Sequence, residues 1–248
     1  METGHIVKSF DEELARLDNM VAEMGGLAEA QLVDAVAALI RRDVAAAERI
    51  VARDRRLDAI ENDLHSLTLR LLALRQPVAA DLRIIVAALK ISSSLERIGD
   101  YAKNIAKRTF ALAKAPALGG AAHSIARMAA LVQAMIKNVL DAYIQRDAAK
   151  ADDVRLRDQE VDQVYTSLFR ELLTYMMEDP RSITAATHLL FVAKNVERIG
   201  DHATGIAEQV HFMVAGELPG ELRPKGDNTS FTVVELGASE QEDEAGSE

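Results

Sequence analysis

Pairs of carboxylates spaced four residues apart are the feature of this sequence best suited to chemistry. This spacing places both side chains on one face of a helix, where two like charges repel by roughly 0.2–0.5 kcal/mol unless a cation lies between them. Four carboxylates from two antiparallel neighbouring helices would form an oxygen-only site that suits Mg²⁺, Mn²⁺ or iron. The candidate metal ligands are Asp54, Asp58, Glu96 and Asp100 in the first half of the chain and Asp158, Asp162, Glu197 and Asp201 in the second half.

A purely structural interpretation of these pairs remains open. Charged helix faces are common, and arginines near the pairs could neutralise them without a metal. Both pairs occur in both halves, and a glycine lies inside each of the two motifs that contain the glutamates. Glycine inside a helix costs about 1 kcal/mol relative to alanine, so it predicts close approach of a partner helix or an ion. The candidate neutralising arginines are Arg55, Arg97, Arg155 and Arg198.

Arrangements typical of enzymes are weak in this sequence. Glu208 and His211 have the Glu-x-x-His spacing of ferritin-like di-iron helices, but such a site needs two of these motifs and two further glutamates on other helices. There is no nucleophile with an evident base, no Walker phosphate loop and no dinucleotide fingerprint. The sequence therefore predicts no catalytic and no cofactor-binding residues, and it favours a protein that is not an enzyme.

The composition favours helices. The 248 residues include no Cys and no Trp, only 4% are aromatic, and the net charge is -10. Absence of Cys excludes disulfides and thiol chemistry, and the acidic balance argues against nucleic acid as the main ligand. Residues 1–10 are largely polar, and apolar runs such as 84–89 are far shorter than the roughly 18 residues of a membrane-spanning helix. We expect a cytoplasmic protein.

Helix caps and apolar periodicity predict six long helices. A capping box begins at Ser9, Asp43 and Asp147 cap the second and fifth helices, and Pro77 lies where the third should start. The second helix shows a heptad pattern that Arg53 interrupts. The expected ranges are about 9–41, 43–74, 77–114, 125–139, 147–175 and 179–216.

The two halves of the chain repeat each other. The segment 95–100 returns as 196–201, displaced by 101 residues, and the preceding acidic pair returns displaced by 104. Three helices in each repeat predict an all-α fold of two tandem antiparallel three-helix bundles with a pseudo-two-fold internal repeat. The expected organisation is 1–115 for the first bundle, 116–214 for the second and 215–248 for a disordered acidic tail, in which 231–234 could instead be a short docking or strand segment.

The repeated Glu-Arg-Ile-Gly-Asp motif resembles that of the PhoU family, and the likeness extends over about residues 5–215, with 75–83, 95–107 and 195–208 as its most specific segments. The resemblance implies a cytoplasmic, non-enzymatic negative regulator of the phosphate regulon. Such a protein would be an adaptor that couples the ATPase of the phosphate ABC transporter to a PhoR-type sensor histidine kinase. The resemblance also implies a homodimer that meets the membrane only through its partners.

Some members of this family bind multinuclear metal clusters through the acidic motifs, so the resemblance implies a possible Fe, Mn, Mg or Zn site. By position, the glutamate and aspartate of each motif match the family pattern, and the acidic pairs match the facing helix. Gly205 stands where the first half has Asn104, which predicts weaker or different metal binding in the second half. An alternative function stays open: a carboxylate-bundle protein whose role is metal storage or redox chemistry.

Overall fold

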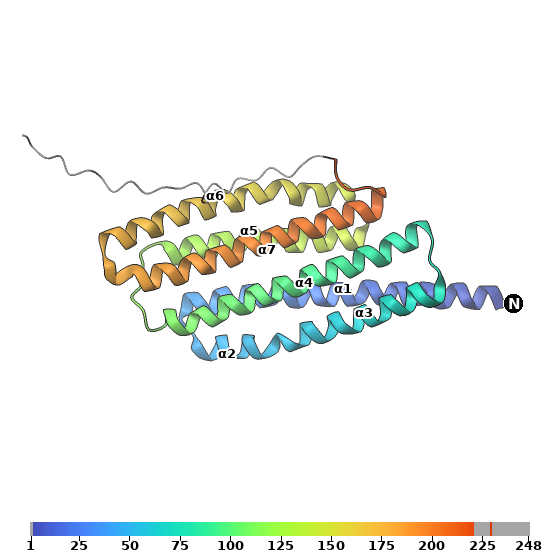
Figure 1. The fold of residues 1–248 in the computed structure, drawn as a ribbon, viewed down its shortest axis with the longest axis horizontal. Coiled ribbons are helices and arrows are strands. Elements are labelled where there is room, and N and C mark those ends of the chain that lie inside the picture. The colour runs from blue at the N-terminus through green and yellow to red at the C-terminus, as the bar shows by residue number, and fades with distance from the viewer. Residues whose placement is uncertain (1, 221–228, 230–248) are drawn as a thin grey trace, which may run out of the picture.

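The computed structural model describes residues 2–220 and 229, and every long element in this part of the chain is an α-helix (Figure 1). The all-α prediction is confirmed. The helices run along the length of the molecule and pack side by side. They are α1 (Glu2–Arg41), α2 (Val44–Arg53), α3 (Arg55–Arg75), α4 (Ala79–Leu112), α5 (Ala121–Gln145), α6 (Ala148–Glu178) and α7 (Ile183–Ala215), with a short 3₁₀ turn, η1 (Pro180–Ser182), before α7.

Two helices begin at residues other than those expected: α1, and α4, which is the third of the six expected helices. α1 begins at Glu2 rather than at Ser9, because a capping residue favours a helix start but does not stop a helix from continuing through it. α4 begins at Ala79, two residues after Pro77, and its N-cap Val78 is extended. The caps at Asp43 and Asp147 are confirmed, since their side chains accept hydrogen bonds from the backbone N–H groups of Ala46 and Lys150.

The helix predicted to begin at Asp43 is present as α2 and α3, which are divided only at Asp54, a residue whose own backbone is in the right-handed helical conformation. The helix is interrupted at Asp54, where the N–H of Leu57 donates to the Asp54 carbonyl at 2.9 Å and tightens the turn to a 3₁₀ type. The heptad pattern places Arg53 at an inward position, whereas the structure leaves Arg53 exposed and buries Asp54. Burial of the shorter side chain follows from the partners that it finds inside the bundle. The corresponding α6 has no interruption.

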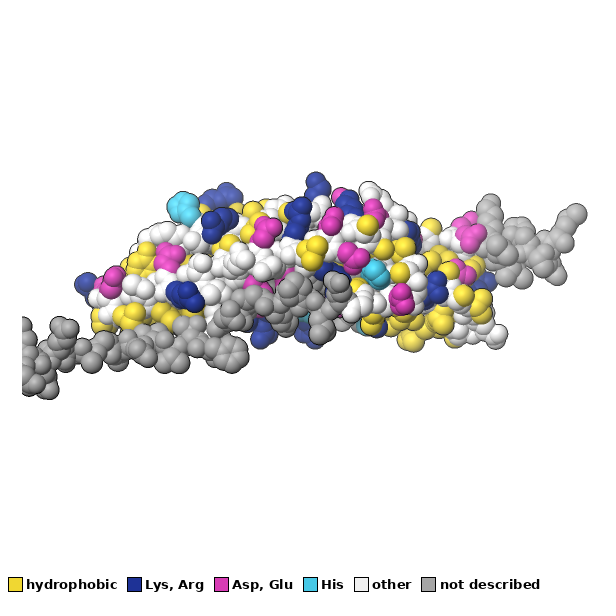
Figure 2. All heavy atoms as spheres, turned by 90° about the horizontal axis from the view of Figure 1, so that it is seen from above, with side chains coloured by type: hydrophobic (Ala, Val, Ile, Leu, Met, Phe, Trp, Pro, Cys, Tyr) yellow, Lys and Arg dark blue, Asp and Glu magenta, His cyan; other side chains and the backbone are white. Residues whose placement is uncertain are grey.

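The helices pack as two groups that share a long interface. α1 to α4 contact one another, as do α5 to α7, and α4 lies along α7 while α1 lies along α5 (Figure 1). The two acidic motifs meet at the α4–α7 interface, where the rings of Tyr101 and His202 are 5.7 Å apart. On the face seen from above in Figure 2, acidic and basic side chains are interspersed along the length of the molecule.

Glycine has a packing role in the first motif. A Cβ atom at Gly99 would overlap Leu57, which is buried in the core, so the close approach of a partner helix explains this glycine. A Cβ at Gly200 would lie 3.4 Å from the Asp158 carboxylate, so this position is less crowded. The close approach that the motif glycines predict is therefore tightest in the first repeat.

None of the described helices is both long and apolar enough to cross a membrane. The division of the chain at 115 and 214 stays a prediction, because packing alone does not say which parts fold independently. The expected tail, including the alternative segment at 231–234, lies outside the described residues apart from its beginning and residue 229.

Candidate functional site

The first carboxylate cluster is closed around a lysine. Asp54 lies at the interruption between α2 and α3 and is only 4% exposed. Its carboxylate accepts hydrogen bonds from Gln31 Nε2 at 2.9 Å and from Lys103 Nζ at 2.5 Å. The same Lys103 ammonium donates to Asp100 Oδ1 at 2.5 Å. Lys103 therefore bridges the two predicted acidic helices from a position between their carboxylates.

The amide of Gln31 completes this arrangement from α1. Its Nε2 atom also donates to the carbonyl of Gly99 at 3.1 Å, so one buried amide ties the motif backbone to Asp54. A buried carboxylate is costly unless it is paired and hydrogen-bonded. Asp54 satisfies both conditions, and this set of contacts holds α1, α4 and the junction between α2 and α3 together.

The pKa values in the first cluster follow from these contacts. Burial lowers the pKa of Lys103, but its hydrogen bonds with Asp100 and Asp54 outweigh burial and hold the pKa above its usual range. Burial raises the pKa of Asp100, but its hydrogen bond and charge interaction with Lys103 dominate, and the pKa is lowered. Both groups are therefore charged at neutral pH, as a salt bridge requires.

Glu96 and Asp58 lie at the edge of the cluster and are less well neutralised. Burial and the nearby negative charge of Asp100 raise the pKa of Glu96 to about 7, although Arg97 opposes this shift from 3.5 Å. Burial, followed by the charge of Asp54, raises the pKa of Asp58. The cluster thus contains one lysine for more than two carboxylates, and the excess negative charge appears as these raised pKa values.

The second cluster is more deeply buried. Asp158 and Asp162 on α6 are 2% and 3% exposed, and Glu197 on α7 is 6% exposed. Lys194 Nζ donates to Glu197 Oε1 at 2.9 Å, while Glu197 Oε2 is buried without a hydrogen-bond partner. Burial raises the pKa of Glu197 despite this lysine. Asp201, one turn further along α7, is partly exposed.

The groups that neutralise the first cluster have no chemical equivalents at the corresponding positions of the second. The displacements of 101 and 104 place Thr204 at the position of Lys103 and Met135 at the position of Gln31. Thr204 donates to the backbone carbonyl of Asp201 at 2.7 Å, and Met135 is buried. The lysine of the second repeat precedes its motif, whereas the lysine of the first follows it. The repeat therefore reproduces the positions of the carboxylates but not those of their counter-ions.

The arginine interpretation describes only part of these sites. Arg97 lies 3.5 Å from both Glu96 and Asp100. Arg198 instead donates to the hydroxyl of Tyr101 at 3.4 Å, across the α4–α7 interface. Arg155 contacts Asp152. The principal cation of the first cluster is a lysine that the sequence interpretation did not select.

The sequence contained a signal for one missed residue and none for the other. Lys103 lies three residues after Asp100, a spacing at which opposite charges pair on a helix. Gln31 lies on another helix, 68 residues from Gly99, and no local pattern connects them. His211, considered above for a di-iron site, instead contacts Asp152 Oδ2 at 3.0 Å.

A lysine forms an ion pair with an acidic side chain in each cluster, and this bears on metal binding. Among residues 2–220 and 229, no group of three or more His, Asp or Glu side chains is arranged to hold one. In the first cluster Lys103 already lies where a cation would bridge Asp54 and Asp100, so those residues do not fit a metal as arranged. In the second cluster Lys194 pairs with Glu197 Oε1, while Glu197 Oε2 is buried without a hydrogen-bond partner, and carboxylate oxygens are the ligands that hard cations prefer. The eight-residue metal assignment stays a prediction.

Comparison with known proteins identifies relatives along nearly the whole chain. The PhoU domain matches residues 21–109 and 125–210, which correspond to the two repeats. A protein of Caulobacter vibrioides named phosphate-specific transport system accessory protein PhoU homolog is 56% identical over 225 residues, covering 91% of this chain and 98% of the relative. A protein of the same name from Rhizobium meliloti is 49% identical and covers 93% of this chain and 97% of the relative.

Solved structures show the same architecture. The crystal structure of PhoU from Pseudomonas aeruginosa superposes with a TM-score of 0.81 at 38% identity, covering 84% of this chain and all of that chain. The structure of the phosphate transport system regulatory protein PhoU from Streptococcus pneumoniae gives a TM-score of 0.79 at 29% identity, covering 86% of this chain and all of that chain.

Proposed function

The chain belongs to the PhoU family, and on this premise we propose that it regulates phosphate uptake as an accessory protein of the phosphate-specific transport system. The observation that carries the proposal is the 56% identity to the Caulobacter vibrioides accessory protein over almost the full length of that relative. A non-enzymatic role is consistent with the first carboxylate cluster, where Lys103 and Gln31 occupy the buried Asp54 in structural contacts.

The finer proposal is an adaptor with two protein partners. One partner is the ATPase of the phosphate ABC transporter, and the other is a PhoR-type sensor histidine kinase that the adaptor damps when phosphate is plentiful. The proposal includes a homodimer, location in the cytoplasm, contact with the membrane only through these partners, and no role for nucleic acid. The net charge of -10 supports the last point, because it opposes attraction to phosphate backbones.

A genetic experiment and a binding experiment test the adaptor separately. Deletion of the gene should switch on a phosphate-regulon reporter in phosphate-rich medium, and the full chain should restore repression. Biolayer interferometry with the purified ATPase and with the cytoplasmic part of the kinase should show saturable binding of each. Intact repression in the deletion strain would reject the regulatory role. If repression is lost in the deletion strain but the purified protein binds neither partner, the adaptor mechanism is rejected and the regulatory role is kept.

A second proposal concerns metal, and the buried Glu197 Oε2 without a hydrogen bond favours it. Glu197, Asp158, Asp162 and Asp201 would hold a cation from the set Fe, Mn, Mg or Zn, which would neutralise the cluster and join α6 to α7. The first cluster would bind a cation only if Lys103 moved away. Gly205, in place of Asn104, predicts weaker metal binding in the second cluster than in the first. The present proposal reverses that order, because Lys103 already lies between two carboxylates of the first cluster and outweighs the amide of Asn104.

Metal analysis by mass spectrometry after equilibration with each ion tests the proposal through matched variants. Loss of an outer partner of a metal ligand costs roughly 10–100-fold in affinity, so Glu197→Gln should weaken binding by at least that range. Glu96→Gln, the equivalent change in the first repeat, should leave the bound metal unchanged. Equal loss in both variants would contradict the assignment to the second cluster. Oxygen consumption by the metal-loaded protein would favour the alternative of a metal storage or redox function.

A further inference from the structure

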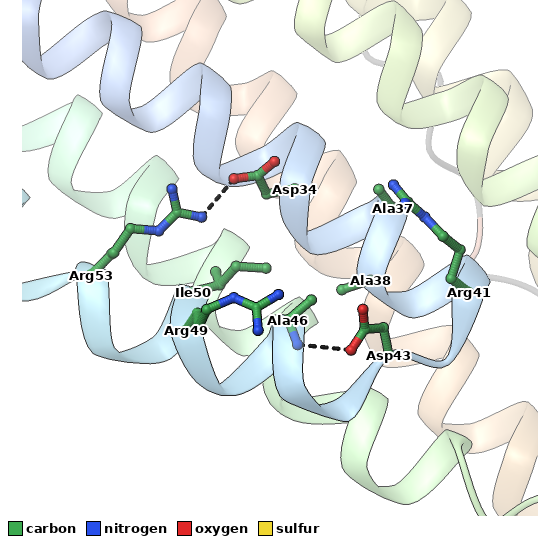
Figure 3. A pocket seen from close by; sticks show the side chains of 9 residues that line it. All are labelled: Asp34, Ala37, Ala38, Arg41, Asp43, Ala46, Arg49, Ile50 and Arg53. Atoms are coloured by element: carbon green, nitrogen blue, oxygen red, sulfur yellow. Dashed lines mark hydrogen bonds and ion pairs between the residues drawn. The ribbon is translucent and has the colours of Figure 1, made fainter.

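A hollow of about 210 Å³ opens between the last turns of α1 and the first turns of α2, outside both carboxylate clusters (Figure 3). Three arginines line it, Arg41 from α1 and Arg49 and Arg53 from α2, together with two aspartates and small apolar side chains. Figure 3 shows the side chains of Arg41 and Arg49 on opposite sides of this hollow.

The two aspartates of the hollow are already committed to other groups. Asp34 Oδ2 forms an ion pair with Arg53 at 2.6 Å, and Asp43 Oδ1 accepts a hydrogen bond from the N–H of Ala46 at 2.9 Å. In the part of the chain that the structure describes, neither Arg41 nor Arg49 forms an ion pair with a carboxylate. Arg41 and Arg49 therefore both line this hollow, and neither is paired with a carboxylate of the described residues.

The charge of this corner is opposite to that of the protein. Residues 41–56 contain six arginines and three carboxylates, a net charge of +3 in a chain whose net charge is -10. The equivalent residues of the second repeat, 145–160, contain four basic and five acidic side chains, a net charge of -1.

The second repeat builds the same corner without counterparts of Arg41 and Arg49, although Arg157 stands at the position of Arg53. Gln145 stands at the position of Arg41 and Asp153 at the position of Arg49, whereas the capping aspartate is present in both repeats. The fold of the corner therefore requires the cap but neither of the two arginines. The shared fold does not explain why Arg41 and Arg49 are present in the first repeat, whereas a ligand that they bind would explain it.

We propose that the hollow lined by Arg41, Arg49 and Arg53 binds a small tetrahedral oxyanion, either free inorganic phosphate or the phosphoryl group of a small phosphorylated molecule. The planar guanidinium group presents paired donors that match the oxygens of a phosphate, which makes arginine the preferred residue for this chemistry. Pockets for drug-sized ligands measure roughly 300–1,000 Å³, so the hollow of about 210 Å³ suits a smaller group. The inference is independent of the adaptor and metal proposals.

Isothermal titration calorimetry of the full chain tests the site with two probes, inorganic phosphate and acetyl phosphate. Low ionic strength is needed because salt screens exposed charges. Saturable binding of one equivalent of inorganic phosphate would support a free anion as ligand, and binding of acetyl phosphate alone would support a phosphoryl group on a small molecule. No saturable binding of either probe would overturn the proposal.

Matched variants separate a site from general attraction. Arg41→Gln/Arg49→Gln should weaken binding by at least about tenfold, because charge-assisted hydrogen bonds are lost. Arg16→Gln/Arg127→Gln removes the same number of exposed arginines elsewhere on α1 and α5 and should change the affinity less than about twofold. Equal weakening in both variants would overturn the proposal. Circular dichroism checks folding, and Arg49→Gln alone replaces the double variant if that variant unfolds.

Discussion

The two carboxylate clusters occupy equivalent positions in the two repeats but are neutralised differently. In the first, one lysine and one glutamine reach the buried Asp54. In the second, three acidic side chains are buried at 2–6% exposure, and Lys194 approaches from the preceding turn of α7. Helix periodicity explains the equivalent positions of the carboxylates, since it acts on backbone spacing. The counter-ion is a separate choice, because any helix that packs against the carboxylate can supply it.

Lys103→Met should produce the largest difference between the repeats. Removal of this ammonium leaves the buried Asp54 and the partly buried Asp100 facing each other without their common cation. We expect a loss of roughly 2–4 kcal/mol in the free energy of unfolding, because breaking a buried pair leaves an uncompensated charge. Urea unfolding measures it.

The matched control in the second repeat is Thr204→Val, which should cost about 1 kcal/mol or less, since a neutral hydroxyl that bonds to backbone carbonyls is lost rather than a charged group. Equal costs for the two variants would show that Lys103 is not the principal stabilising group of the first cluster.

Gly99→Ala should destabilise the protein more than Gly200→Ala. A new methyl group at position 99 overlaps the buried Leu57, whereas one at position 200 lies at ordinary contact distance from Asp158. Overpacking costs roughly 1–3 kcal/mol, and alanine returns about 1 kcal/mol of helix propensity in both variants. We therefore expect a net loss of about 0–2 kcal/mol for Gly99→Ala and a gain of up to about 1 kcal/mol for Gly200→Ala, measured by thermal and urea unfolding. The reverse order would show that the second motif is the more tightly packed one.

The stability of the protein should depend on pH through Glu96. Its folded pKa of about 7 lies above the ordinary value of 4.5, so the unfolded chain releases this proton more readily. Stability therefore decreases as the pH rises from about 4.5 to 7, by roughly 1–2 kcal/mol after allowance for screening at a partly exposed site. Urea unfolding at intervals of pH measures the slope.

Glu96→Gln removes this proton and should flatten the dependence of stability on pH between 4.5 and 7 relative to the unaltered chain. Lys103 and Asp100 stay charged throughout this range and do not produce the slope. An unchanged slope in Glu96→Gln would assign the titration to another group.

The helix caps should show the smallest effects and no difference between the repeats. Asp43 and Asp147 accept equivalent hydrogen bonds from Ala46 and Lys150, at 2.9 and 3.0 Å. Replacement of either aspartate by alanine should cost about 1 kcal/mol in the free energy of unfolding. A clear difference between the two variants, measured by urea unfolding, would contradict the equivalence of the corners.

Much of the fold could be predicted from local patterns. The caps at Asp43 and Asp147 and the all-α class depend on interactions within a few residues, and these are confirmed. The burial of Asp54 could not be predicted, because its partners Gln31 and Lys103 come from two other helices. The capping box at Ser9 predicts a helix start there, but α1 begins at Glu2, because a favourable capping residue does not prevent a helix from running through it.

The sequence by itself determined that acidic pairs share helix faces in both halves and that the two halves repeat, because both properties follow from spacing along the chain. Only the tertiary structure decided which carboxylates are buried, that Lys103 takes the bridging position in the first cluster, and that Arg41 and Arg49 meet at one hollow. The physical reason is that burial and ion pairing depend on side chains from different helices, whose approach is set by packing across the whole bundle rather than by any local pattern.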